Sequence, residues 1–282
     1  IFDGKVRDYL EADSTRSQLY PGMRFDVNRL DEERQRITQL LQNRGYFRFN
    51  KDYIVFQADT MLNTYKVGLT MKLQPFQSKK KNKQEKHPQY TIRKVHYLLD
   101  ADFATLSKNE LKGLDSICSG GVNLYYKDKL YLRPKVLTNN LSIVPGSLYN
   151  EPDVQRTYSN FGRLQALKYT NIRFFETQVG DTAKLNAYVM LTKSKYQSVS
   201  FELEGTNSAG DLGAAASVSF QNRNMFKGSE TFMIKLRGAY EAVSGLQGGY
   251  NHEDYTELGA EATINFPRFL FPFRRRSGYA HE

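Results

Sequence analysis

The stretch VSFELEGTNSAGDLGAAASVSFQ, Val199–Gln221, decides the fold of the C-terminal third because apolar and polar residues alternate along it. The apolar set in its first half is Val199, Phe201 and Leu203, and the polar set is Ser200, Glu202 and Glu204. Successive side chains of a β-strand point to opposite faces, so this pattern predicts a strand with one apolar and one polar face. The alternation resumes at Ala214–Gln221, which predicts a second strand of the same kind.

Two further segments toward the C-terminus repeat this alternation. They are TFMIKLRGAYEA, Thr231–Ala242, and TELGAEATINF, Thr256–Phe266, and in both the charged side chains fall on one face only. The segments approach the length of about 9 to 11 residues that crosses a bilayer at a tilt. A soluble β-sandwich alternates in the same way, and the period does not say which side faces lipid. Small residues and the one-sided charge favour a transmembrane β-barrel over a sandwich.

About four such strands cannot close a barrel, because the smallest membrane barrels have about 8 strands. We therefore expect residues 196–282 to form the first antiparallel strands of a truncated transmembrane β-barrel, with the natural end of the chain lying beyond Glu282.

Upstream, the chain contains an internal repeat. YPGMRFDVNRL, Tyr20–Leu30, aligns without a gap with VPGSLYNEPDV, Val144–Val154, at an offset of 124 residues. Asp26 and Asn150 stand at equivalent positions as helix N-caps, and Gly45 is suited to end the first helix. The apolar stripes of the two predicted helices are Leu30, Ile37, Leu40 and Leu41, and Val154, Tyr158, Phe161 and Leu164. The Pro-Gly turn is expected to supply backbone freedom before each helix, with Phe25 and Tyr149 packing at its start.

Two strand-like runs follow each predicted helix, and one run precedes the second helix. The runs are Asp52–Asp59, Tyr65–Phe76, Lys168–Gln178 and Lys184–Thr192, preceded in the second copy by Tyr90–Leu99. The matching first strand of the first copy is expected to be missing or to lie before Ile1. Both copies therefore predict an α+β unit, with helices on a small mixed sheet. The domain boundaries that follow are 1–76, a basic linker or hairpin loop at 77–89, a second repeat at 90–195, and the barrel strands at 196–282.

Composition narrows the classes of function. The 282 residues carry a formal net charge of +10, which suits anionic partners such as lipid headgroups, but the basic residues do not cluster on one helix or sheet face as nucleic-acid binding would require. Cys118 is the only cysteine, and the four histidines show no metal-ligand spacing. No apolar run is long enough for a transmembrane helix. We expect no catalytic residue, no metal, no cofactor and no nucleic-acid partner.

The order of these segments resembles the BamA/TamA superfamily of outer-membrane assembly proteins, whose periplasmic repeats are called POTRA domains. The segments that carry the resemblance are PGMRFD and ERQRITQLLQNRGYFRFN, VPGSLYNEPDVQRTYSNFGRLQALKYTNIRF, FELEGTNSAGDLGAAASVSFQNRNMFKGSE and FPRFLFPF. The segment LDEERQRITQLLQNRGYFRFNKDYIVF looks most like the TamL branch. The resemblance covers nearly the whole chain.

The resemblance implies a noncovalent function in the Gram-negative outer membrane, with POTRA domains in the periplasm. Unfolded outer-membrane proteins would be received there by β-augmentation and inserted through the barrel seam. The implied partners are these clients, outer-membrane lipid, and periplasmic or inner-membrane assembly proteins such as a TamB-like protein. The alternative is a soluble periplasmic adaptor or scaffold whose C-terminal sheet is a β-sandwich.

The resemblance also implies where client strands would bind. The second strand of each POTRA domain should lie at a sheet edge, although a neighbouring domain could equally cover that edge. The implied client-binding residues are Tyr53, Val55, Gln57, Tyr169, Asn171, Ile172 and Phe174. The strand Val199–Glu204 would form one side of the seam that opens for the client.

Overall fold

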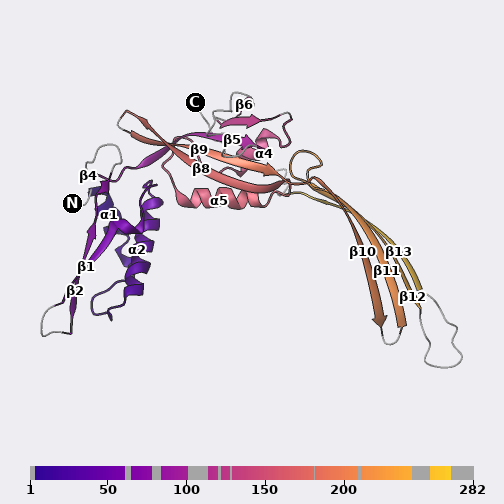
Figure 1. The fold of residues 1–282 in the computed structure, drawn as a ribbon, viewed down its shortest axis with the longest axis horizontal. Coiled ribbons are helices and arrows are strands. Elements are labelled where there is room, and N and C mark those ends of the chain that lie inside the picture. The colour runs from indigo at the N-terminus through magenta and orange to yellow at the C-terminus, as the bar shows by residue number, and fades with distance from the viewer. Residues whose placement is uncertain are drawn as a thin grey trace.

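The computed structural model describes residues 4–60, 65–77, 84–100, 114–119, 122–127, 129–180, 182–208, 211–242 and 255–267. Three units follow one another along the long axis of the molecule, as Figure 1 shows: a first repeat, a second repeat and a sheet of long strands. The described part is an α+β fold followed by an antiparallel sheet.

The first repeat packs two helices against a two-stranded sheet. The helices are α1, Gly4–Ala12, and α2, Val27–Gln42, and the antiparallel strands are β1, Ile54–Thr60, and β2, Val67–Leu73. Short 3-10 helices lie at Ser14–Arg16 (η1) and Lys51–Tyr53 (η2). A cluster of buried residues, among them Ile37, Leu41 and Tyr46, joins these elements.

The second repeat holds a five-stranded mixed sheet in the order β6-β7-β5-β9-β8. Its strands are β5, Tyr90–Leu99; β6, Asp115–Ser119; β7, Val122–Tyr126; β8, Leu167–Val179; and β9, Thr182–Lys193. β5 pairs in parallel with both β7 and β9, whereas β8 pairs antiparallel with β9. Two helices, α4, Pro134–Asn140, and α5, Glu151–Gly162, accompany this sheet.

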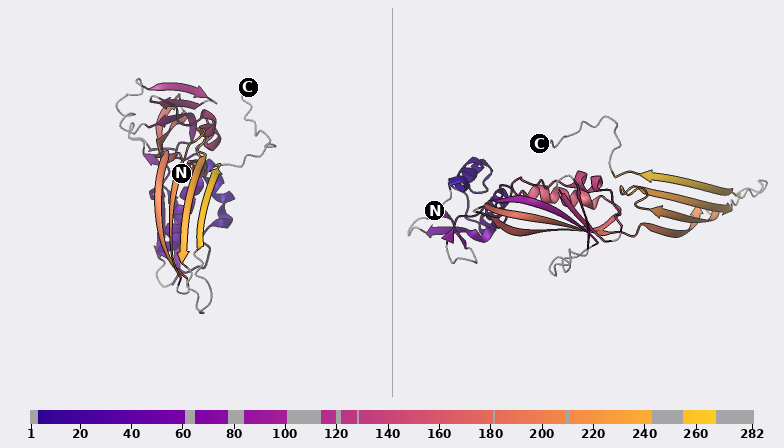
Figure 2. Two further views of the ribbon diagram at one scale, coloured as in Figure 1. Left: turned by 90° about the vertical axis from the view of Figure 1, so that its right-hand side faces the viewer. Right: turned by 90° about the horizontal axis from the view of Figure 1, so that it is seen from above.

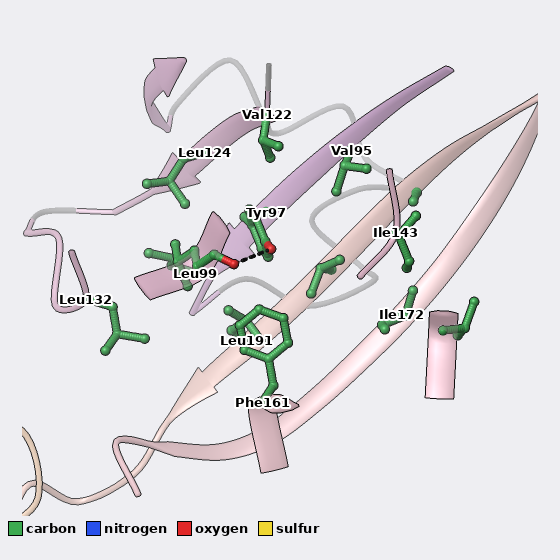
Figure 3. Close-up of a cluster of buried hydrophobic side chains, with 14 of the residues drawn as sticks. Val95, Tyr97, Leu99, Val122, Leu124, Leu132, Ile143, Phe161, Ile172 and Leu191 are labelled. Atoms are coloured by element: carbon green, nitrogen blue, oxygen red, sulfur yellow. Dashed lines mark hydrogen bonds between the residues drawn. The ribbon is translucent and has the colours of Figure 1, made fainter. Parts of the chain in front are cut away.

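The main hydrophobic core lies between this sheet and its helices. Figure 3 shows Phe161 of α5 beside Leu191 of β9, with Tyr97 of β5 close by. Tyr97 is fully buried, and its hydroxyl donates to the Leu137 carbonyl oxygen at 2.9 Å. This core fixes α5 on the sheet and therefore sets the position of α5 relative to β8.

The repeated Pro-Gly motif forms the same turn in both repeats. Met23 N donates to Tyr20 O at 3.3 Å, and Ser147 N donates to Val144 O at 3.2 Å. Gly22 and Gly146 adopt φ values of 85° and 87°, the left-handed geometry that the third position of a type II turn requires. The shared turn explains why the sequence repeats at this place.

The helices that follow the two turns differ at their caps. Asp26 accepts a hydrogen bond from Asn28 N at 2.9 Å, whereas the equivalent Asn150 makes no cap bond. The position two residues after Asn150 is Pro152, which has no N–H to donate, and Asn150 Oδ1 is buried without a partner. The expected packing at the turn also differs, because Tyr149 is buried and Phe25 is 46% exposed.

The segment 77–89, expected as a linker or hairpin loop, contains part of a small hairpin. Its strands are β3, Phe76–Gln77, and β4, Gln84–Glu85. Beyond β4, the ring of His87 packs against Phe49, Tyr53 and Phe76 of the first repeat, and its Nε2 lies 2.9 Å from Gln74 O.

The C-terminal unit is an antiparallel four-stranded sheet in the order β10-β11-β12-β13. The strands are β10, Gln197–Ser208; β11, Asp211–Asn222; β12, Thr231–Ala242; and β13, Tyr255–Asn265. Figure 2 shows it as a curved sheet that extends beyond the second repeat. Within the described residues the sheet is open at β10 and at β13. No described helix is both long enough and apolar enough to span a bilayer.

Candidate functional site

Strand β8 is a free edge of the second repeat, since β9 is its only strand partner among the described residues. The sequence-predicted residues Tyr169, Asn171, Ile172 and Phe174 all lie on it. Their backbone groups do not all face outward, however. Ile172 N donates to the hydroxyl of Tyr158 on α5 at 2.9 Å, so the backbone of Ile172 faces away from β9. Backbone direction alternates along a strand, which makes Thr170 and Phe174 outward-facing and turns Tyr169 and Asn171 toward β9.

The side chains of β8 divide between two faces. Ile172 is buried and Phe174 is half-buried in the core, whereas Tyr169 is 62% exposed on the opposite face. Tyr169 and Asn171 can therefore offer side chains to a partner, while Thr170, Ile172 and Phe174 carry the backbone groups that could pair with a strand.

In the first repeat, one of the predicted client-binding residues does not lie on a strand. Tyr53 lies in η2 rather than in a strand, because Asn50 caps this short helix through a hydrogen bond from Asp52 N at 2.9 Å. Tyr53 O accepts from Gln74 N at 2.8 Å, so Tyr53 faces the β2 side. The backbone groups of Val55 and Gln57, two and four residues further on, point toward β2 in the same way. Those of Phe56 and Ala58 on β1 therefore point outward.

An open groove of 990 Å³ lies in the first repeat between the turn segment 20–26 and β2. In the second repeat, β5 fills the equivalent place: Gly146 N donates to Ile92 O at 2.7 Å, and β5 also pairs with β9. No strand of the described residues fills it in the first repeat, where Val67 and Leu69 of β2 stay exposed. The first strand that the repeat leads one to expect is thus absent from the part of the chain that the structure describes.

The loop after α2 joins the two repeats at the end of β8. The ring of Phe47 lies 5.0 Å from Tyr149 and 5.5 Å from Phe174, measured between ring centroids. Tyr90 N donates to Gly45 O at 2.8 Å, and Arg48 forms an ion pair with Glu176 of β8. The first repeat therefore covers the side chains at this end of β8, although none of its described residues forms a strand pair with β8.

The sheet β10–β13 has one apolar and one polar face, as the alternation predicts. The register places Leu203, Ala216, Gly238 and Leu258 in one row across the four strands. Leu203 and Leu258 are 88% and 86% exposed, and Phe201 in the next row is 79% exposed. No second layer of described residues covers this apolar face, in contrast to the core of a β-sandwich.

The opposite face carries hydrogen-bonded polar and charged groups. Lys235 Nζ lies 2.9 Å from Glu202 Oε2, and Arg237 Nη2 lies 3.2 Å from Glu204 Oε2. Ser217 donates to Glu202 at 3.1 Å. These bonds connect β10 to β11 and to β12 on the polar side, which fits a face that contacts water.

The predicted seam residues Val199, Ser200, Phe201, Glu202, Leu203 and Glu204 lie on β10. β10 is an edge strand that pairs with β11 over its whole length. Its other edge has no strand partner among the described residues. The structure thus places all six residues beside an open edge.

A buried turn between β11 and β12, which the sequence pattern does not predict, attaches the sheet to the second repeat. Glu230 is 5% exposed; its carboxylate accepts from Arg133 Nη2 at 2.7 Å and from Gly228 N at 2.8 Å. Ala166 N donates to Ser229 Oγ at 2.9 Å, and Arg133 N donates to Lys227 O at 2.9 Å. We call residues 223–230 the docking turn. These contacts join residues 63 and 97 positions apart, which no local pattern could reveal.

No cluster of three or more His, Cys, Asp or Glu residues that could hold a metal ion occurs in the described part of the chain. Cys118 is exposed on β6, and His96 is buried and stacks on Tyr188. The expectation that the chain is not an enzyme stays a prediction.

The sequence matches no protein-family model and no curated protein. Among solved structures, the chain is similar to BamA from Haemophilus ducreyi lacking POTRA domains 1–3, with 12% identity over 94% of this chain and 46% of that chain, and a TM-score of 0.49. CdiB from Acinetobacter baumannii shows 11% identity over 78% of this chain and 50% of that chain, with a TM-score of 0.32.

The N-terminal domain of Omp85 from Thermosynechococcus elongatus shows 13% identity over 66% of this chain and 92% of that chain, with a TM-score of 0.22. The chain spans about half the length of the BamA and CdiB structures. These likenesses are distant and carry no functional conclusion for this chain.

Proposed function

We propose that this chain belongs to an outer-membrane protein assembly or translocation component of the BamA/TamA superfamily. In this proposal the two repeats are POTRA domains in the periplasm, and β10–β13 are the first strands of a β-barrel in the outer membrane. The same proposal includes the TamL branch, an assembly partner resembling TamB, and contact with outer-membrane lipid. These three parts rest on the sequence resemblance.

The observation that carries the proposal is the bare apolar face of β10–β13. A soluble protein rarely exposes a continuous apolar surface of this kind, because contact of apolar side chains with water is unfavourable. The strands are 11 or 12 residues long, enough to cross a bilayer at a tilt. Lipid would cover the apolar face, and water would contact the face that carries Lys235, Arg237, Glu202 and Glu204.

The client-binding part of the proposal rests on the two edges. An unpaired strand offers N–H and C=O groups to an incoming strand, and this pairing needs no covalent step. On β8 these groups belong to Thr170, Ile172 and Phe174, and the exposed Tyr169 would contact the client's side chains. On β1 they belong to Phe56 and Ala58. The open edge of β10, along Val199–Glu204, would be the seam through which clients enter the membrane.

Two variants of neighbouring residues test the membrane assignment. Leu258 lies on the apolar face of β13, and Glu257 lies on the polar face. Arginine on a lipid-facing strand costs about 2–4 kcal/mol near the bilayer centre and less near its surfaces, whereas a water-facing position tolerates it. Leu258→Arg should therefore lower the amount of heat-modifiable, membrane-inserted full-length protein, while Glu257→Arg should not.

Protease protection supplies the second readout. In sealed outer-membrane vesicles, residues 197–265 should resist protease, and the two repeats should be digested only after the periplasmic side is opened. A full-length protein that stays soluble without detergent, with Leu258→Arg tolerated as well as Glu257→Arg, would refute the barrel and favour the soluble adaptor with a sandwich.

A further inference from the structure

The edge of β8 is occupied at one point by a side chain. The hydroxyl of Tyr158 accepts the hydrogen bond from Ile172 N at 2.9 Å and lies 3.5 Å from Ile172 O, to which it can donate. A single phenol thus contacts both outward backbone groups of Ile172, in the place where a neighbouring strand would contact them. Among the outward positions of β8, Ile172 lies between Thr170 and Phe174 at the middle of the proposed docking segment.

The position of Tyr158 is set by the core. Its ring is half-buried and packs against the main hydrophobic cluster, on the same helical stripe as Val154 and Phe161. α5 therefore holds the hydroxyl at the edge without a covalent or ionic constraint. A rotation of the side chain would release Ile172, because the hydroxyl can exchange its two protein partners for water.

We propose that Tyr158 is a removable cap on the β8 edge, and that a client strand must displace its hydroxyl before it can pair with Ile172. This inference rests on the proposed strand-binding function of the edge and adds a way in which strand binding is regulated. An unoccupied edge strand promotes unwanted pairing with other chains, and a capped edge lowers that risk. An incoming strand that offers one C=O and one N–H opposite Ile172 replaces both contacts, whereas a strand shifted by one residue leaves Ile172 unsatisfied.

The cap is tested with Tyr158→Phe in the full-length protein. The variant keeps the ring and removes only the oxygen. The loss of one neutral hydrogen bond corresponds to about a fivefold change in an equilibrium constant. We expect the Ile172 amide to exchange about fivefold faster with deuterated water and a client-like strand to bind about fivefold more tightly. The probe is a synthetic peptide of residues 212–222, LGAAASVSFQN, which has the alternation of a barrel strand.

Tyr9→Phe is the matched control, since Tyr9 is a half-buried tyrosine on α1 and is not among the residues that line the open groove of the first repeat. It should change neither readout. Thermal unfolding of both variants verifies that they are folded, and Tyr158→Leu, which removes the ring as well as the hydroxyl, gives a second uncapped variant.

Amide exchange at Ile172 and peptide binding together distinguish a failure of the proposed cap from a failure of the proposed strand-binding function. Faster exchange at Ile172 together with tighter peptide binding supports the proposal. Unchanged exchange at Ile172 overturns it, because the hydroxyl then does not protect the amide. Faster exchange with unchanged peptide binding overturns the claim that the cap controls strand docking. Peptide binding that is undetectable in wild-type and variant proteins overturns that claim as well, and it also counts against the proposed function of the edge.

Discussion

Substitution of Glu230 by glutamine should loosen the docking turn that joins the strand sheet to the second repeat. Glu230 Oε1 accepts from Arg133, and Oε2 accepts from Gly228 N at 2.8 Å and Phe226 N at 3.3 Å. Glutamine has nearly the same shape but replaces one acceptor oxygen by an amide donor. In either orientation of the amide, a donor would then face Arg133 or the two backbone N–H groups.

The expected cost follows from the groups left without an acceptor. A hydrogen bond to a charged group contributes roughly 1.5–3 kcal/mol when it is buried. The side chain of Arg133 is 52% exposed, so water can replace part of its interaction, whereas Gly228 N is buried. We therefore expect a loss of about 2 kcal/mol in the local opening free energy of the docking turn, which corresponds to about 30-fold faster hydrogen exchange.

Hydrogen exchange followed by mass spectrometry on the full-length protein in detergent measures this change in peptides that cover residues 223–230. Glu202→Gln provides the comparison, because the ion pair of Glu202 with Lys235 is exposed and should matter little to the turn. Exchange in Glu230→Gln that remains within about threefold of the wild type would show that the carboxylate does not hold the turn.

Two further predictions concern the β8 edge and the dependence of stability on pH. Thr170→Pro removes an outward N–H, so it should leave the fold intact and abolish docking of the 212–222 peptide. Asn171→Pro removes a hydrogen bond to β9 and should lower the unfolding free energy by roughly 1–3 kcal/mol. Equal effects of the two variants in thermal unfolding and peptide binding would refute the assigned backbone directions. Burial lowers the pKa of His87, whereas the same side chain in the unfolded chain takes up a proton at about pH 6.5. The first repeat should therefore lose stability as the pH falls below that value. A His87→Gln variant should lose less stability between pH 7.5 and 5.5, and an identical loss in melting temperature for both proteins would contradict the assignment.

Local sequence signals predicted the repeat and most of its strands. The strand Tyr90–Leu99 was predicted with the bounds that the structure shows, and the Pro-Gly turn marked the start of α2 and α5 correctly. These features depend on a glycine at positive φ, an N-cap and an alternating pattern, all of which act over a few residues. The missing cap bond at Asn150 could also have been predicted, because Pro152 lacks the N–H that Asn28 donates in the first repeat.

The errors and omissions came from features that a local pattern does not contain. The alternation that predicted a strand at Tyr53 does not show that Asn50 caps a 3-10 helix there. The backbone directions along β1 and β8 depend on which residue first pairs with the inner strand. A local pattern therefore does not show that Val55, Gln57, Tyr169 and Asn171 turn their backbone groups toward the inner strand, and the role of the predicted residues in client binding stays a prediction. β6, β7 and α4 were missed because the segment between β5 and α5 shows no sustained period.

The described contacts connect the proposed docking edge to the proposed membrane strands through a short path. β8 begins at Leu167, and the preceding Ala166 donates its N–H to Ser229 of the docking turn, which continues directly into β12. β9, the inner partner of β8, leads through Tyr196 into β10, and Arg223 N of the docking turn donates to Tyr196 O at 2.8 Å. The repeat therefore meets the sheet at two adjacent points rather than through a single flexible linker. This double attachment should hold the docking edge in a fixed orientation relative to β10, so that a strand bound at β8 would approach the open edge of the sheet from a defined direction.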